Sequence, residues 1–290
     1  MNAPSGQAQT HFWNRFQAGL RRLVWQRGHI PVRKSTPAFL VGNGRSGTSM
    51  IVRQLAKSWQ VKLYNEGDPE AFENWFLRDF AVIEKLTRRS AAPLTLFKPI
   101  KDTYRTHQLL NAFTAAKVLF AFRHYDDVVN SARKKFFDGE GHPRSPDGRP
   151  PRFEFPPAAR WISDDFQEFS AAPPPEATRA SLRRLWNPAL NLESNIALHW
   201  LFLNRLFFDQ GLDLHPRVRL IHYEKLVTLP TQEFRGILAF LNLTFDSRVL
   251  DGVFSTSVQR DQPPPLDPLV RENCEQVWRR LEEASDHGQT

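Results

Sequence analysis

The stretch "LVGNGRSGTSM", residues 40–50, constrains the fold more than any other part of the sequence. It joins a short apolar run to a helical pattern. Gly42, Gly47 and Ser49 fit the Walker frame G-x-x-x-x-G-K-[ST]. Thr48 stands where that frame has its lysine. A glycine-rich loop between a strand and a helix directs backbone N–H groups at an anion. The loop therefore predicts a phosphate site that lacks the lysine needed for a triphosphate.

From Pro37 onward, short apolar runs alternate with helical patterns, which is typical of a parallel sheet with crossover helices. The sequence thus predicts one α/β domain with a central parallel sheet of about five strands, at 37–43, 61–65, 94–100, 117–123 and 218–224. Two helices carry clear start signals. Asp68 and Pro69 predict the start of a helix over 68–86, and Asp267 caps a helix opened by Pro268.

Side chains of the loop supply one charge and three hydroxyl groups to the predicted anion site. Arg45 is the only basic side chain in it. We expect a ligand that presents a single phosphate group here. The predicted ligand-binding residues of the loop are Gly44, Arg45, Ser46, Gly47, Thr48 and Ser49.

A second anion site is predicted after the fourth strand, in "AFRHYDDVVNSARKK". Arg123 ends the strand, and Ser131 follows eight residues later in the next helix. Ligands of doubly wound sheets bind at the carboxyl ends of the strands. An arginine and a hydroxyl at that edge can hold a phosphate through charge-assisted hydrogen bonds.

Positive charge is concentrated near the N-terminus. The formal net charge is +8, and residues 1–65 hold ten Lys or Arg and no Asp or Glu. A basic lobe raises the local concentration of an anionic ligand. Because no zinc spacing or basic helix with stacking aromatics accompanies it, the pattern does not favour a nucleic acid as partner.

Residues 1–36 are predicted to be a basic amphipathic extension, followed by a single domain over 37–290. Within the extension, an apolar stripe beside arginines at 11–27 is compatible with peripheral membrane contact, with packing on the domain or with a transit peptide. No apolar run is long enough to span a membrane, and the single cysteine, Cys274, suits a reducing compartment. We expect a cytoplasmic protein, with membrane association left open.

The segment 138–190 interrupts the alternation with many prolines and glycines. Such residues disfavour strands and long helices, and long loops of this kind are usually functional or disordered. The aromatic residues within it, including Trp161 and Trp186, argue against disorder. The segment is predicted to be a lid beside the site and favours a partly apolar acceptor, although its arginines would also suit an anionic one.

Three motifs in order resemble the sulfotransferases that use 3′-phosphoadenosine 5′-phosphosulfate (PAPS): "GNGRSGTSM", "FRHYDDVVNS" and "RLIHYEKLVTLPTQEFRGILAFLNL". The resemblance covers roughly residues 37–243, except the proline-rich segment. It implies a sulfotransferase fold of the P-loop type, with PAPS as co-substrate and no metal. It also implies that the loop holds the 5′-phosphosulfate while Arg123 and Ser131 hold the 3′-phosphate.

The resemblance extends to candidate catalytic residues. Sulfuryl transfer needs a base for the acceptor hydroxyl and positive charge near the leaving oxygen. The chain has no histidine where small-molecule members of the family place their base, and Glu66 after the second strand matches the position used by tyrosylprotein-type members. Lys98 and Arg45 match cations near the transferred group. Ser257 and Arg260 fall where relatives close over the adenosine.

The leading interpretation is thus a PAPS-dependent transfer of a sulfuryl group by in-line displacement to a hydroxyl of a lipid, phenolic compound or glycan. Two alternatives remain at this point: a P-loop kinase with an altered loop, whose magnesium carboxylate would be Asp126 or Asp127, and a non-catalytic protein that binds anions or a membrane surface. Glu66 itself could be a surface charge and no more.

Overall fold

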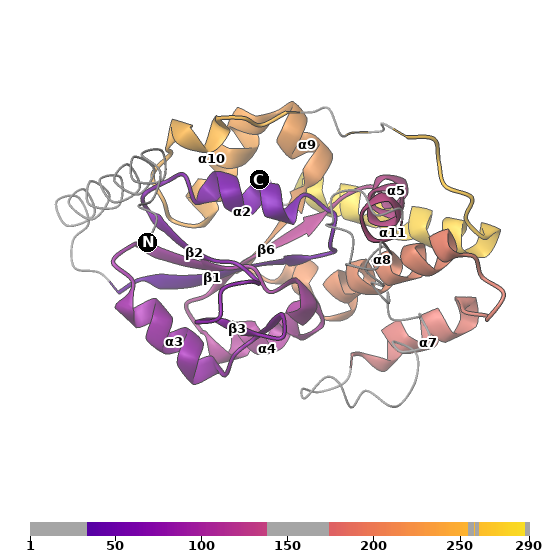
Figure 1. Ribbon diagram of the computed structural model, residues 1–290, viewed down its shortest axis with the longest axis horizontal. Coiled ribbons are helices and arrows are strands. Elements are labelled where there is room, and N and C mark those ends of the chain that lie inside the picture. The colour runs from indigo at the N-terminus through magenta and orange to yellow at the C-terminus, as the bar shows by residue number, and fades with distance from the viewer. Residues whose placement is uncertain (1–33, 138–173, 255–257, 259–260, 288–290) are drawn as a thin grey trace, which may run out of the picture.

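A computed structural model describes residues 34–137, 174–254, 258 and 261–287 of the chain (Figure 1). Its centre is a parallel five-stranded sheet in the order β2-β5-β1-β6-β7. The strands are β1 (Thr36–Gly42), β2 (Val61–Tyr64), β5 (Leu94–Phe97), β6 (Lys117–Phe122) and β7 (Val218–His222). The predicted α/β architecture with a central parallel sheet is confirmed.

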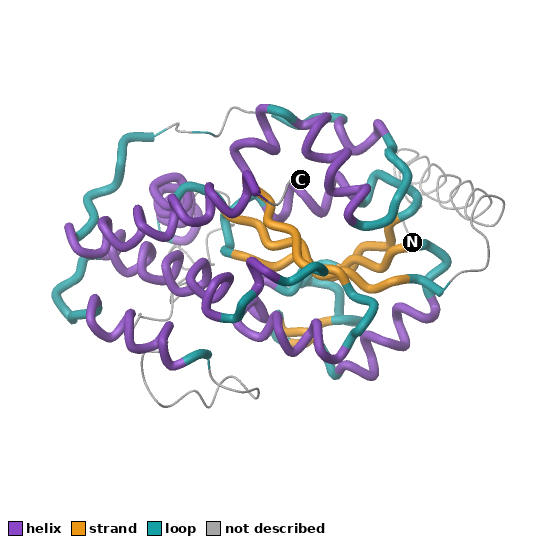
Figure 2. The backbone as a smooth tube through the Cα atoms, turned by 180° about the vertical axis from the view of Figure 1, so that it is seen from behind, coloured by secondary structure: helices purple, strands orange, loops and turns teal. Residues whose placement is uncertain are grey.

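Helices cover both faces of this sheet (Figures 1 and 2). One face packs its apolar side chains against α2 (Thr48–Leu55), α9 (Tyr223–Thr228) and α10 (Pro230–Phe240). The other face packs against α3 (Phe80–Arg89), α4 (Thr106–Ala112), α5 (Tyr125–Phe136) and α8 (Leu192–Asp209). The last helix, α11 (Pro268–His287), packs beside α8 and β7. In the part of the chain that the structure describes, no helix combines the length and the apolar composition of a membrane span.

The parallel register places the carboxyl ends of all five strands at one edge of the sheet. Gly42 at the end of β1 pairs with Ala121 of β6, and Phe122 of β6 pairs with His222 of β7. On the other side, Tyr64 of β2 pairs with Phe97 of β5. The segments that follow these strands therefore converge although they are far apart in the sequence.

The predicted helix over 68–86 is wrong in its first half. Asp68 accepts a hydrogen bond from the Asn65 N–H at 2.6 Å and closes a turn. A hairpin of β3 (Phe72–Glu73) and β4 (Phe76–Leu77) follows, and α3 begins only at Phe80. The two residues between the strands, Asn74 and Trp75, both have positive φ, as the type I′ form of a two-residue hairpin turn requires.

The proline-rich segment holds a helix that the sequence interpretation did not foresee. Residues 138–173 lie outside the described part, but α7 (Glu176–Leu185) forms directly after the prolines and packs on α8. Its Thr178 and Leu182 are buried. Residues 176–185 thus belong to the packed body of the domain and do not form a loop. The predicted start of α11 is confirmed, since Asp267 Oδ1 accepts from the N–H groups of Leu269 and Val270.

Short connecting helices complete the described chain: η1 (Ile100–Arg105), η2 (Leu212–Leu214) and η3 (Ser247–Leu250). Of these, η1 follows β5 and contacts β1, which places it at the carboxyl edge of the sheet.

Candidate functional site

Three residues of the loop between β1 and α2 have positive φ angles, in the left-handed region. Their φ angles are 120° at Gly42, 71° at Arg45 and 75° at Gly47. The Thr103 hydroxyl of η1 accepts a hydrogen bond from the Gly42 N–H at 3.0 Å and lies at the same distance from the Gly42 carbonyl oxygen. Because Thr103 engages both backbone groups, the exit of β1 is fixed.

Close packing explains two of the glycines. A Cβ on Gly42 would lie 2.1 Å from the Ala121 carbonyl oxygen of β6. A Cβ on Gly47 would lie 2.1 Å from the Tyr223 ring at the start of α9. By contrast, a Cβ on Gly44 would meet no atom within 4 Å. The loop therefore rests on β6 and Tyr223 while its Gly44 side faces open space.

Several donors of the loop point to an anionic ligand. The backbone N–H groups of Gly44, Arg45, Gly47, Thr48 and Ser49 donate to no acceptor among the residues that the structure describes. Ser46 is fully buried, and its Oγ has no hydrogen-bond partner there. The same holds for Nδ2 of buried Asn43. Unpaired N–H groups beside the first turn of α2 form the kind of concavity that holds a phosphate or sulfate.

The two predicted anion sites are joined through Arg45. Its Nε donates to Ser131 Oγ on α5 at 3.0 Å. Arg123, which follows β6, has a nitrogen 3.4 Å from the Arg45 carbonyl oxygen. It also donates to Asp127 at 3.0 Å, and its guanidinium lies 4.7 Å from the centre of the Tyr223 ring. Burial, followed by the charge of Arg123, lowers the pKa of Arg45 from its ordinary value.

Lys98 and Glu66 form an ion pair at the same edge of the sheet. Lys98 follows β5, Glu66 follows β2 by two residues, and Lys98 Nζ lies 2.8 Å from Glu66 Oε2. The exposed fractions of the two side chains are only 7% and 15%. A lysine this buried needs a partner, and Glu66 supplies one. Glu66 is thus no isolated surface charge.

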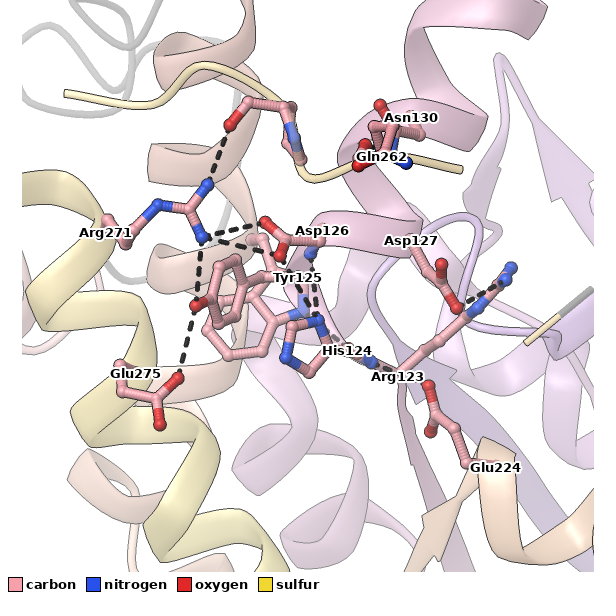
Figure 3. A network of polar contacts seen from close by, with 12 residues as sticks. Arg123, His124, Tyr125, Asp126, Asp127, Asn130, Glu224, Gln262, Arg271 and Glu275 are labelled. Atoms are coloured by element: carbon pink, nitrogen blue, oxygen red, sulfur yellow. Dashed lines mark hydrogen bonds and ion pairs between the residues drawn. The ribbon is translucent and has the colours of Figure 1, made fainter. Parts of the chain in front are cut away.

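Ion pairs fix the helix that carries Ser131 (Figure 3). In its first turn, Asp126 pairs with Arg271 of α11 at 3.2 Å, and Tyr125 donates to Glu275 at 3.2 Å. Farther along, Asn130 donates to the Gln262 carbonyl oxygen at 2.9 Å. Both candidates for the magnesium carboxylate of a kinase are therefore already engaged, Asp126 by Arg271 and Asp127 by Arg123. The described residues include no cluster of three or more His, Cys, Asp or Glu suited to a metal ion.

Most of the predicted site residues are brought together, and two lie outside the described part of the chain. The latter are Ser257 and Arg260. The next residues, Asp261 and Gln262, contact Lys134 and Asn130 of α5.

Three residues of this region escaped the sequence interpretation: Thr103, Tyr223 and Lys135. No sequence motif marks Thr103, because a single threonine after a strand does not differ from other threonines in the sequence. Tyr223 lies in the third motif of the resemblance, in which no site residue is predicted. Lys135 lies one helical turn beyond Ser131, and this spacing places both residues on one face of α5. The spacing is visible in the sequence and could have identified Lys135.

Several solved structures with a similar fold are sulfotransferases. A sulfotransferase domain from the olefin synthase of Synechococcus PCC 7002 has a TM-score of 0.50 at 16% sequence identity, with 86% of this chain and 97% of that chain covered. A sulfotransferase from Alicyclobacillus acidocaldarius has a TM-score of 0.49 at 18% identity, over 88% of this chain and 96% of that chain. A mouse sulfotransferase in complex with PAP has a TM-score of 0.44 at 13% identity, over 92% and 91%.

No protein-family model and no curated protein sequence matches the chain. The parallel sheet with its glycine-rich first loop and flanking helices, together with the similarity to the Synechococcus domain, shows that this chain has the sulfotransferase fold.

Proposed function

We propose that the chain is a sulfotransferase that moves a sulfuryl group from PAPS to an acceptor hydroxyl by in-line displacement. The observation that carries the proposal is the convergence of two features at one edge of the sheet. The first is a cradle for anions made by the loop of residues 43–49, Arg45, Ser131 and Arg123. The second is the buried Lys98–Glu66 pair.

The donors of the site fit a nucleoside 3′,5′-bisphosphate. The N–H groups of the loop and the Ser46 hydroxyl would hold the 5′-phosphosulfate, because they have no other acceptor among the described residues. Arg123 and Ser131 would hold the 3′-phosphate. Arg45 would contribute charge to both positions, since it already bonds to Ser131. Such a ligand needs neither the Walker lysine nor a magnesium carboxylate.

When bound, PAPS would supply an activated sulfuryl group. The chain would supply the rest of the chemistry. Glu66, whose Oε2 is held by Lys98, would accept the proton of the acceptor hydroxyl. Lys98 and Arg45 would stabilise negative charge on the oxygen that leaves, as preorganised donors do in other transferases.

A ligand comparison tests this function. The thermal stability of the full chain is measured with 3′-phosphoadenosine 5′-phosphate (PAP) and, separately, with ATP and Mg²⁺. PAP at about 100 times its dissociation constant should stabilise the fold by about 2.7 kcal/mol. ATP with Mg²⁺ should stabilise it much less. Equal stabilisation by both ligands would reject the PAPS assignment and favour a kinase.

A further inference from the structure

Helix α5 carries three consecutive cations, and two of them have carboxylate partners. Arg133 lies 3.5 Å from Glu193 of α8, and Lys134 lies 2.6 Å from Asp261. Lys135 has no carboxylate partner among the described residues. It is half-buried and lies on the same face of α5 as Ser131, four residues earlier.

Two other cations act electrostatically on Lys135. Burial lowers the pKa of Lys135, and the charges of Arg45 and Lys98 lower it further. These two residues belong to the two halves of the site, since Arg45 bonds to Ser131 and Lys98 bonds to Glu66. Lys135 is therefore close enough to the anion cradle and to the Lys98–Glu66 pair for cations of both to act on it. Among the described residues, Glu66 pairs with Lys98 and Asp127 pairs with Arg123, whereas no carboxylate pairs with Arg45 or Lys135.

We propose that Lys135 binds an anionic group on the acceptor, so that the substrate is a hydroxyl compound that also carries a carboxylate, phosphate or sulfate. The inference rests on the proposed function, because it places the acceptor beside Glu66. A half-buried ammonium among like charges is stabilised when an anion binds to it, and that gain is available only to an acceptor that brings a negative charge.

The position of Lys135 favours the acceptor over the donor. The loop N–H groups, Arg45 and Arg123 already account for the phosphates of the donor. Lys98 holds the proposed base, which must contact the acceptor hydroxyl. Because the charge of Lys98 acts on Lys135, Lys135 lies near the reacting end of the acceptor in this arrangement.

Matched probes test the inference. Binding of 4-hydroxyphenylacetate and of neutral 4-hydroxyphenylacetamide is measured by calorimetry on the full chain saturated with PAP. The wild-type complex should bind the carboxylate about tenfold more tightly, the scale of one charge-assisted hydrogen bond. Lys135→Met should abolish this preference. Lys134→Met removes the same charge from the preceding position of α5. This variant should retain the preference for the carboxylate.

A charge-reversal variant tests the same contact through a gain of binding, which a misfolded protein would not show. Lys135→Glu should bind the cationic probe tyramine more tightly than the wild type does. If the wild-type complex binds neither probe, or both equally, the inference is wrong. It is also wrong if Lys134→Met and Lys135→Met behave alike, or if Lys135→Met weakens PAP as much as the carboxylate. Failure of PAP itself to bind the wild type would instead reject the proposed function.

Discussion

Arg45 and Ser131 are 86 positions apart in the sequence, yet Arg45 Nε donates a hydrogen bond to Ser131 Oγ at 3.0 Å. The bond joins the loop after β1 to helix α5. Because Arg123 also approaches the Arg45 carbonyl oxygen, the two predicted phosphate positions form one continuous site. A ligand with a single phosphate would use only part of it.

We expect Arg123→Ala to weaken PAP binding far more than binding of adenosine 5′-phosphate, because only PAP has a 3′-phosphate to lose. The loss should be about 10- to 100-fold for PAP, as for other hydrogen bonds to charged groups. Ser131→Ala should shift the same ratio less, and Arg45→Ala should weaken both ligands. Dissociation constants from calorimetry give these ratios.

Arg133→Ala, which removes a charge paired with Glu193, is the control. An unchanged preference for PAP in Arg123→Ala would mean that the 3′-phosphate binds elsewhere.

Glu66→Gln should lower turnover by about 100-fold or more while leaving PAP affinity nearly unchanged, because an amide cannot accept the acceptor proton. Turnover is measured with labelled PAPS and an acceptor that the wild type sulfates. The exposed Glu73 in the nearby hairpin offers a control, since Glu73→Gln removes a carboxylate without touching Lys98. Normal turnover of Glu66→Gln would assign the base to another residue, with buried Asp102 the first to examine.

Gly47→Ala should destabilise the free protein by about 2 to 4 kcal/mol, from the positive φ and the overlap with Tyr223 together. Gly44→Ala is the matched control in the same loop, because its Cβ would meet no atom within 4 Å. Urea unfolding without ligand measures both. Similar stabilities of the two variants would contradict the described packing of the loop on Tyr223.

Asp102 predicts a pH dependence of folding stability. Burial raises its pKa from 3.8 to about 6, against the opposing effects of Arg105 and of the Leu77 N–H. The folded protein therefore holds this proton at pH values where the unfolded chain has released it. That contribution to stability is full below about pH 4 and is lost as the pH rises through about 6.

Asp102→Asn should remove this loss of folding stability at higher pH. The loss is on the order of 3 kcal/mol for a pKa shift of about two units. The free energy of unfolding in urea is compared between about pH 4 and pH 7, with the exposed Glu84→Gln as a control. The same slope in Asp102→Asn and in the wild type would contradict the assignment.

Local patterns in the sequence were sufficient for the sheet, the loop and the start of the last helix. The alternation of apolar runs with helical patterns predicted five parallel strands, and residues 40–50 marked the turn from β1 to α2. Asp267 and Pro268 predicted the start of α11. These features depend on residues close together in the chain, whose spacing reflects the period of a helix or strand. The loop and the end of the fourth strand also singled out Arg45, Arg123 and Ser131 as site residues, and the resemblance to sulfotransferases added Glu66 and Lys98.

Only the tertiary structure decided which of these residues meet. The parallel sheet gathers the carboxyl ends of β1, β2, β5 and β6 at one edge, so that Lys98 pairs with Glu66 across 32 positions and Thr103 holds Gly42 across 61. The hairpin at 72–77 depends on such a contact too, because the Leu77 N–H donates to buried Asp102. A pattern of local spacing carries no information about partners this distant, and the order of the strands in the sheet supplies it.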